Sequence, residues 1–205
     1  MALFIPTYFS PISQYGMIFQ SDHLEFEVED NFQKQTYRNR CYIYGANGKQ
    51  LLNIPITHSK SELKQKTKDI LIEEGSNWQK QHYKSLKTAY NSSPFFEFYE
   101  DDLMKIFSAN YKYLLDVNID SFLFINDALE LLKQHSLTEE YVDNASKDFR
   151  NLASVKKHPK TNCASYIQVF DDKFGFLQNL SILDLLFMEG PNTISFLEKV
   201  NVTLE

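Results

Sequence analysis

The sequence predicts an α/β fold in which an open sheet carries an added layer of helices. The first observation is the opening of the chain, where two strand-like apolar runs, Ala2–Ile5 and Leu24–Val28, enclose an amphipathic helical segment at Ser13–Gln20. Strand, helix and strand in succession are typical of the start of an open α/β sheet. The second observation is a series of three amphipathic helical segments between residues 77 and 134, which predicts a helical layer.

Length and composition predict one domain, residues 1–205, with a helical subdomain around 77–134. A chain of 205 residues that is 43% apolar can bury one substantial core. The net charge of −6 argues against a nucleic-acid partner, because binding to phosphates needs a basic surface. With two cysteines, no signal-peptide pattern and no apolar run near the roughly 20 residues of a membrane span, we expect a cytoplasmic protein with free thiols.

After the opening unit we expect a hairpin, a loop and one more strand. Tyr37–Tyr44 and Leu51–Ile56 have strand character, and the turn Gly45–Gly48 between them holds two glycines that tolerate positive φ. Thr57–Lys68 is polar and lysine-rich, which indicates a surface loop. Asp69–Glu73 predicts a short strand.

The second half of the chain predicts five helices, two strands and a long loop. The helices are one that begins at Asn77 and is ended by Ser92-Ser93-Pro94, then Phe95–Ala109, Leu114–Gln134, Ser181–Glu189 and Asn192–Val200. The expected strands are an edge strand at Thr138–Val142 and another at Tyr166–Phe170, and the polar segment Asp143–Cys163 is expected to be a mobile surface loop. Ser181 and Asp184 have the spacing of a helix capping box, which favours a structural over a catalytic role for Asp184.

The loop after the first strand is the first candidate binding segment. Prolines 6 and 11 exclude helix from it, and it should lie at the carboxyl ends of the strands, where open α/β sheets commonly bind ligands. We expect Tyr8, Gln14 and Tyr15 to line a pocket there through hydrogen bonds and ring faces. Packing of the two tyrosines in the core is the alternative.

The second candidate is the run Arg38-Asn39-Arg40. On a strand, two arginines two residues apart point to the same face and can hold an anionic ligand in bidentate fashion. Ion pairing with the many acidic residues at the strand surface is the alternative, and the sequence leaves both open.

The third candidate is a pair of helix neighbours, Trp78 and His82, at i and i+4. Trp78 is a candidate ligand contact, and His82 is a candidate general base near neutral pH. A hydrogen-bonded packing histidine is the alternative. The sequence has no phosphate-binding loop, dinucleotide glycine pattern, zinc-ligand spacing or serine-hydrolase elbow, so we expect no cofactor and no metal.

Six motifs follow one another over nearly the whole chain: Ile5-Pro6-Thr7-Tyr8-Phe9-Ser10-Pro11, Tyr37-Arg38-Asn39-Arg40, Leu52-Asn53-Ile54-Pro55-Ile56, Trp78-Gln79-Lys80-Gln81-His82-Tyr83-Lys84-Ser85, Tyr90 with Ser93-Pro94-Phe95-Phe96, and a C-terminal run that starts at Phe174-Gly175-Phe176 and ends at Gly190-Pro191. In order and spacing they resemble the WbqC-like protein family. Many members of that family begin the first motif with Gln-Pro and follow it with Trp-x-Gly-Tyr. This chain has Ile5-Pro6 and Ile12-Ser13-Gln14-Tyr15 there, and it resembles a compact version of the family.

A weaker similarity concerns topology. The loop Phe9-Ser10-Pro11-Ile12-Ser13-Gln14-Tyr15-Gly16 is similar in rhythm to the first loop of the nucleotidyltransferase-like α/β superfamily. This similarity implies a Rossmann-like (nucleotidyltransferase-like) sheet. The two histidines that contact nucleotide phosphate in that superfamily are absent here, so the similarity carries no chemistry.

The family resemblance implies a bacterial transferase of surface-polysaccharide (O-antigen-type, lipopolysaccharide) or amino-sugar biosynthesis. Its expected partner is a small activated sugar or acyl donor, with Arg40 binding the anionic donor and His82 accepting a proton. The alternative is a non-catalytic binding or scaffold protein of the same pathway. The sequence leaves the donor, the acceptor and the oligomeric state open.

Overall fold

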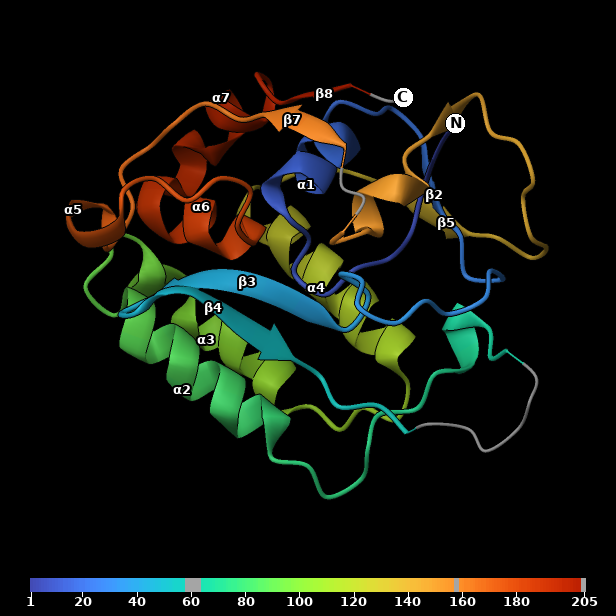
Figure 1. The fold of residues 1–205 in the computed structure, drawn as a ribbon, viewed down its shortest axis with the longest axis horizontal. Helices are drawn as coiled ribbons and strands as arrows, with labels where there is room; N and C mark the ends of the chain where they lie inside the picture. Colours follow the sequence, from blue (N-terminus) through green and yellow to red (C-terminus); the bar gives the residue numbers. More distant parts are fainter. Residues whose placement is uncertain (58–63, 157–158, 204–205) are drawn as a thin grey trace.

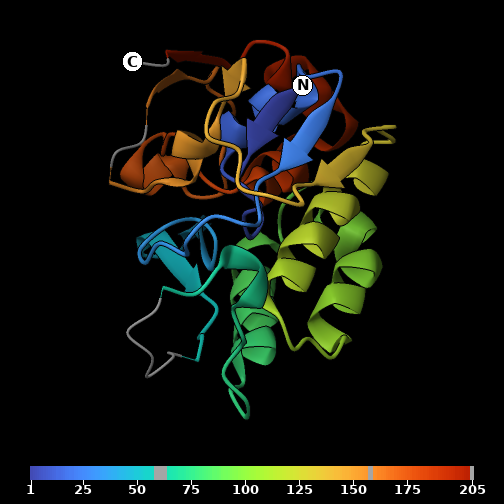
Figure 2. The same cartoon turned by 90° about the vertical axis from the view of Figure 1, so that its right-hand side faces the viewer.

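The computed structural model describes residues 1–57, 64–156 and 159–203 and confirms an α/β fold. It contains a parallel four-stranded sheet flanked by helices (Figures 1 and 2). The strands, in spatial order, are β5 (His135–Leu137), β2 (Leu24–Phe26), β1 (Ala2–Phe4) and β6 (Lys147–Asp148). All three neighbouring pairs are parallel.

The predicted opening unit of strand, helix and strand is present. β1 is apolar throughout and buried, as expected for a central parallel strand covered on both faces. The helix α1 (Ile12–Phe19) begins directly after Pro11 and leads into β2, which pairs with β1 in the register Ala2–Leu24.

The predicted hairpin is also present, as β3 (Arg40–Gly45) and β4 (Gly48–Asn53). A two-residue turn joins the strands, and Gly48 adopts φ 94°, which glycine tolerates. The first strand begins at Arg40 and not at Tyr37. The backbone of Tyr37 instead donates to the carbonyl of Ala153, and the chain turns before it enters the hairpin.

Three successive helices lie below the sheet and beside the hairpin in the view of Figure 2: α2 (Trp78–Tyr90), α3 (Phe96–Ser108) and α4 (Leu114–Ala128). α2 contacts both β3 and α3, and α3 contacts α4. The prediction that the last of these helices extends to Gln134 was wrong. The chain leaves the helix after Ala128 and reverses at Glu130, which adopts φ 53°.

Several predicted strands and loops have a different structure. No strand occupies Thr138–Val142, because the Thr138 hydroxyl turns inward to donate to Glu27; the strand is β5, directly before it. Asp69–Glu73 contributes only isolated bridges at Leu71 and Ile72, after the short helix η1 (Thr67–Asp69). Of the predicted loop Thr57–Lys68, residues 58–63 lie outside the described residues.

The segment Asp143–Cys163 is not the continuous loop that its polar sequence predicts. It contains β6, the short helix η2 (Arg150–Ala153) and β7 (Lys160–Asn162), while residues 157–158 lie outside the described residues. β7 pairs antiparallel with β8 (Asn201–Thr203) near the end of the chain. This polar segment forms strands because β6 pairs with β1 and β7 pairs with β8, both of which are distant in the sequence.

The C-terminal part consists of α5 (Asp171–Phe174), α6 (Ile182–Glu189), η3 (Gly190–Asn192) and α7 (Thr193–Leu197). The predicted strand Tyr166–Phe170 is absent, and the predicted last helix is shorter than Asn192–Val200. The capping box is also absent: the Ser181 hydroxyl accepts from the backbone of Leu183, and the Asp184 carboxylate turns away. Buried Tyr90, Tyr166 and Gln168 donate to that carboxylate instead.

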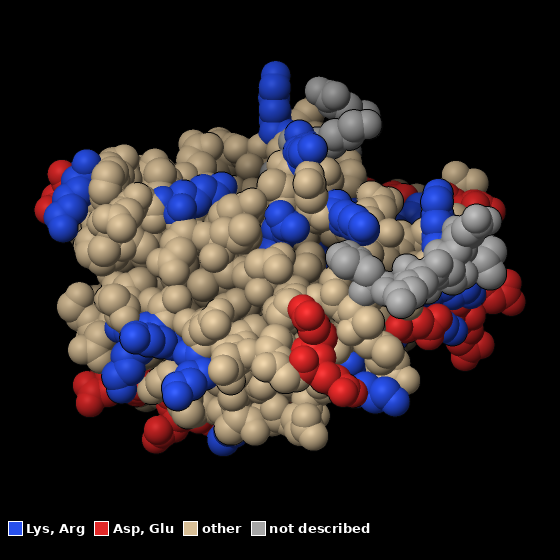
Figure 3. Space-filling model, turned by 60° about the horizontal axis from the view of Figure 1, so that its bottom comes forward, with Lys and Arg blue, Asp and Glu red and all other residues tan. Residues whose placement is uncertain are grey.

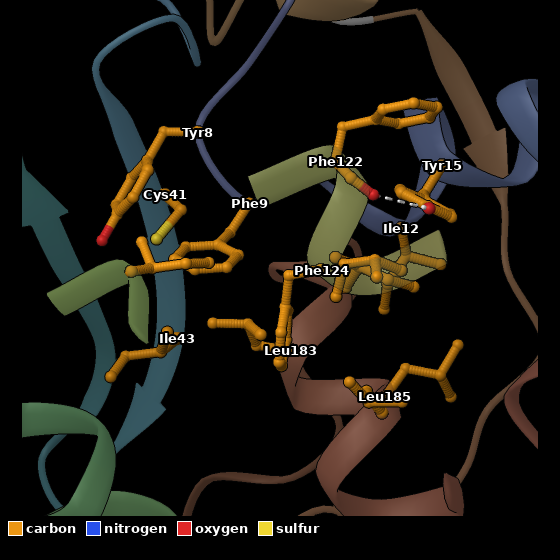
Figure 4. Packing of buried hydrophobic residues seen from close by; sticks show 14 of the residues in the cluster. Tyr8, Phe9, Ile12, Tyr15, Cys41, Ile43, Phe122, Phe124, Leu183 and Leu185 are labelled. Atoms are coloured by element: carbon orange, nitrogen blue, oxygen red, sulfur yellow. Dashed lines mark hydrogen bonds between the residues drawn. The ribbon is translucent and has the colours of Figure 1, made fainter. Parts of the chain in front are cut away.

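Side chains from all of these parts meet in one core. In Figure 4, Tyr8, Phe9 and Cys41 point toward Ile43 and Leu183, which come from the hairpin and α6. Both cysteines are free and buried. Among the described residues, no helix is both long and apolar enough to cross a membrane. On the face drawn in Figure 3, charged side chains form small groups, several of which contain both signs, with broad uncharged areas between them.

Candidate functional site

The start of the hairpin opens onto a cavity of about 500 Å³, which we call the Arg40 cavity. Two cationic side chains, one carboxylate and three side-chain amides line it, together with apolar groups. The lining residues are Phe32, Lys34, Gln35, Asn39, Arg40, Asn53, Pro55, Ile56, Thr57 and Glu73. Its volume lies within the range of small-molecule sites.

Arg40 is half-buried at the first position of β3. Among the described residues it forms no ion pair, and its Nε is buried without a hydrogen-bond acceptor. A buried N–H group without an acceptor costs on the order of 1–3 kcal/mol, so such groups in native proteins call for an explanation. An anionic ligand that accepts from the guanidinium in the cavity would provide the missing partner.

One wall of the cavity carries two amides, Asn39 and Asn53, and Asn53 is the cross-strand partner of Arg40. Asn39 is only 6% exposed, and its Nδ2 donates to Asn53 Oδ1 at 3.2 Å and to the Ile54 carbonyl at 2.9 Å. Its Oδ1 has no partner among the described residues. Gln35, which also lines the cavity, adopts φ 60°, a left-handed conformation that is unfavourable for a residue other than glycine. Backbone strain and unpartnered polar atoms both occur preferentially at functional sites.

His82 lies directly behind this wall. Its Nε2 is 3.2 Å from the Asn53 carbonyl oxygen, which can only accept, so Nε2 carries the proton. Its Nδ1 therefore accepts from the Tyr8 hydroxyl, at 3.0 Å. Burial lowers the pKa of His82 to about 4, so the ring is neutral at pH 7. The arrangement corresponds to the packing histidine that the sequence left as the alternative.

A chain of hydrogen bonds thus connects four separate sequence motifs. It runs from Tyr8 through His82 and Asn53 to Asn39, the neighbour of Arg40. Trp78 packs edge-on against His82, with ring centroids 5.3 Å apart. Trp78 also lines a neighbouring cavity of about 660 Å³, the Trp78 cavity, which shares Thr57 and Glu73 with the Arg40 cavity.

The first-loop candidates lie in the interior. Tyr8, Gln14 and Tyr15 are all at most 1% exposed. Gln14 donates to the Ile5 carbonyl at 2.8 Å, and Tyr15 donates to Asn126 at 3.0 Å and weakly to the Phe122 carbonyl (Figure 4). Burial raises the pKa of both tyrosines well above the ordinary value. Core packing, the alternative for the two tyrosines, describes their geometry, and Tyr8 reaches the cavity wall only through His82.

Arg38 does not share the cavity of Arg40, because it precedes the strand and turns to the other side of the chain. Its buried guanidinium pairs with Asp30 and donates to Thr67 and Thr36, each at 3.3 Å. Burial lowers the pKa of Arg38, and the neighbouring Asp30 carboxylate counteracts this effect. For Arg38 the ion-pairing alternative holds, although the partner is buried.

Arg38 lines another cavity, the Arg38 cavity, of about 660 Å³, next to Ile5 and Arg150. Ile5 follows β1 and Arg150 follows β6, so this cavity lies at the carboxyl ends of the two strands where the strand order changes direction. Phe32 lines both the Arg38 cavity and the Arg40 cavity. Arg150 is also paired, with Asp148.

The sequence reasoning did not select Asn53, Gln35 or Lys34. A signal for Asn53 was present, because a two-residue turn fixes the hairpin register and places Asn53 opposite Arg40. The loop carrying Lys34 and Gln35 has no periodic pattern that would place it at the cavity.

Fold and site together define the class of this protein. It is an α/β protein with a helix-flanked parallel sheet and a cavity whose arginine forms no ion pair among the described residues. The chain belongs to the WbqC-like protein family, whose sequence profile matches residues 6–168. That range includes Tyr8, Arg40, Asn53 and His82. Membership of this family suggests a role in a polysaccharide-related pathway.

One relative is the "Uncharacterized protein Rv1507c" of Mycobacterium tuberculosis. It is 26% identical to this chain over 204 residues, covering 84% of this chain and 87% of the relative. No solved structure gives a significant match to the chain.

Proposed function

We propose that the chain is a transferase of bacterial surface-polysaccharide (O-antigen-type) or amino-sugar biosynthesis that binds the anionic part of an activated sugar or acyl donor in the Arg40 cavity. The observation that carries this proposal is the half-buried Arg40 guanidinium. Within the described part of the chain it forms no ion pair, although Glu73 lines the same cavity, and its buried Nε has no acceptor. The sheet, with β1 between β2 and β6, supports a Rossmann-like arrangement for such an enzyme.

The chemistry of the cavity suits a phosphate-containing donor. A guanidinium offers a planar fork of N–H donors that matches phosphate and carboxylate geometry. Lys34 adds a second positive charge, and the Asn39 Oδ1 can accept from a ligand hydroxyl or amide. Adjoining cavities beside Phe32 and beside Thr57 give an acceptor substrate room next to the donor.

His82 acts as a positioning residue in this proposal. It holds the Asn53 carbonyl and thereby the wall that carries Asn39 and Asn53, with both ring nitrogens occupied by Tyr8 and Asn53. The proposal therefore assigns the proton-acceptor role to no residue of this chain. Because both ring nitrogens of His82 are already hydrogen-bonded, a second candidate function remains. In it the chain is a non-catalytic protein of the pathway that binds the anionic ligand without converting it.

The test is ligand-induced stabilisation. UDP-N-acetylglucosamine, acetyl coenzyme A and inorganic diphosphate are each titrated against the folded chain, because a ligand that binds only the folded state raises Tm. We expect at least one probe to raise Tm and Arg40→Ala to weaken its affinity by about tenfold to a hundredfold, the usual value of a charge-assisted hydrogen bond. Arg40→Lys keeps the charge but loses the fork, and should restore only part of the affinity.

The matched control is Lys80→Ala, which removes the same charge from the exposed face of α2. It should leave binding unchanged. Equal losses in Arg40→Ala and Lys80→Ala would contradict the proposal, as would binding that neither substitution weakens. Binding without turnover, when a donor is offered together with a range of sugar acceptors, would favour the non-catalytic candidate.

A further inference from the structure

α3 and α4 form a helical hairpin whose outer side holds a groove of about 480 Å³, the α3–α4 groove. It lies away from the Arg40 cavity and shares no lining residue with it. The groove is lined by Phe98, Tyr99, Asp102, Lys105, Ile106, Ala109, Tyr111, Asp120, Leu123, Phe124, Asp127, Ala128 and Glu130.

The groove has the length of a three-turn helix. On α3 its lining residues recur at i, i+4, i+7 and i+11 from Phe98 to Ala109, a single stripe along the helix. At a rise of 1.5 Å per residue, this stripe is about 16 Å long. Residues 120 to 128 of α4 form the facing stripe. A third helix laid between the two stripes would complete a small bundle.

The floor of the groove is apolar and partly uncovered. Ile106 and Phe124 are buried at its base, whereas Phe98 is 76% exposed and Leu123 is 39% exposed. A phenylalanine this exposed contributes little to the core of its own chain. Beside a groove with an apolar floor, it has the position of an anchor for a partner.

The walls of the groove are acidic. Four carboxylates line it against one ammonium, a net charge of −3. Lys105 pairs with Asp102, and Tyr111 donates to Asp120, both within the chain. Among the described residues, Asp127 and Glu130 form no ion pair with a lysine or arginine. A ligand for this groove must therefore supply positive charge as well as apolar surface.

We propose that the α3–α4 groove docks a basic amphipathic helix of a partner protein. The helix would place apolar side chains at i, i+3 or i+4, and i+7 on Phe98 and Leu123, and would place lysine or arginine side chains against Asp127 and Glu130. An anionic membrane surface has the wrong charge for these walls. A second copy of this chain is the weaker fit, because the basic face of its α2 offers exposed Lys80 and Lys84, whereas Lys87 is already paired with Glu100.

The probe is a pair of synthetic 18-residue helices with the same leucine pattern, one carrying lysine and the other glutamate at the remaining positions. Fluorescence anisotropy of the labelled peptides measures binding to the full chain. We expect the lysine peptide to bind and the glutamate peptide not to bind, with affinity falling as salt is raised.

Two groups of variants separate apolar anchoring from charge. Phe98→Ala should weaken the lysine peptide by at least about tenfold, as for an interface hot spot. The double substitution Asp127→Asn with Glu130→Gln should weaken it less, by about threefold to tenfold, and reduce its salt dependence. The control is Leu132→Ala, because this leucine is 98% exposed but outside the groove, and this variant should bind like the unchanged chain.

Equal binding of both peptides, or equal affinity for the Phe98→Ala and unchanged chains, would overturn the proposal. Self-association that Phe98→Ala abolishes, without peptide binding, would assign the groove to a second copy instead. Arg40→Ala should leave peptide binding unchanged, so failure of the donor proposal and failure of this one can be told apart.

Discussion

Arg38 and Arg40 are the same residue type two positions apart, yet their surroundings give them opposite properties. Asp30 and two threonines satisfy the Arg38 guanidinium in the interior. Arg40 lines the cavity and forms no ion pair with any carboxylate in the described part of the chain. Within a buried ion pair each charge compensates the other, so Arg38 is committed to Asp30, whereas a guanidinium without such a partner at a cavity keeps its capacity for a ligand. At the residue scale, the two arginines therefore differ in their partners: Arg38 has a carboxylate of its own chain, and Arg40 faces a cavity.

His82 gives a prediction for the effect of pH on stability. Its pKa of about 4 in the folded state lies below the ordinary value near 6.5, so the unfolded chain takes up a proton at a higher pH than the folded chain does. His82 therefore contributes stability that is present above about pH 6.5 and is lost as pH falls toward 4, by about 3 kcal/mol in total.

Urea unfolding at pH 7, 6 and 5 checks this prediction against His82→Gln, which cannot titrate. The difference in free energy of unfolding between the unchanged chain and the variant should be largest at pH 7 and should shrink at each lower pH. A difference that stays constant with pH would show that His82 is protonated in the same range in both states.

At the scale of elements, the residue at position 16 of α1 is determined by the close approach of Val200 and not by helix propensity. Gly16 lies inside α1, where alanine would ordinarily favour the helix by about 1 kcal/mol. A Cβ at this position would lie 2.5 Å from the Val200 Cβ, closer than any real contact. The glycine allows residue 200 to pack against α1, and so brings the end of the chain to its beginning.

We therefore expect Gly16→Ala to destabilise the protein by about 1–3 kcal/mol, the usual cost of overpacking, although helix propensity alone predicts the opposite sign. Chemical denaturation measures the change. In a Val200→Gly background the clashing side chain is gone, and Gly16→Ala should then cost much less. The same cost in both backgrounds would mean that contact with Val200 is not the cause.

At the scale of the whole molecule, one continuous core joins the sheet, the hairpin and the helical layer. Phe4 of β1, Ile43 of β3, Leu103 of α3 and Leu183 of α6 belong to the same buried cluster. Asn118 of α4 also donates to the carbonyls of Pro6 and Arg38 in the first half of the chain. These contacts cross the boundary of the helical subdomain predicted around 77–134.

We expect the chain to unfold in one cooperative transition, because separating residues 77–134 from the rest would expose this shared core. Differential scanning calorimetry should give a calorimetric enthalpy equal to the van't Hoff enthalpy. Two resolved transitions would instead mean that the helical layer is a separate folding unit.

Local patterns in the sequence were sufficient for much of the fold. The strand at the start of the chain, the helix that follows it and the hairpin around Gly45–Gly48 depend on neighbours in the chain, and each is present close to its predicted position. The strand at His135–Leu137 and the order within 143–163 could not be predicted in this way. These segments are short and polar, and pairing with β2, β1 and β8 determines their structure.

The candidate site was predictable only in part for the same reason. The sequence by itself determined the family, the hairpin with its turn at Gly45–Gly48, and the residue types available for binding an anion. The tertiary structure alone decided that Asp30 and Thr67 neutralise Arg38, that Tyr8 and Asn53 hold His82, and that Arg40 is left to a cavity. The physical reason is that a charged or polar side chain is satisfied by whatever group folding brings within hydrogen-bonding distance, and most of these partners are far away in the sequence.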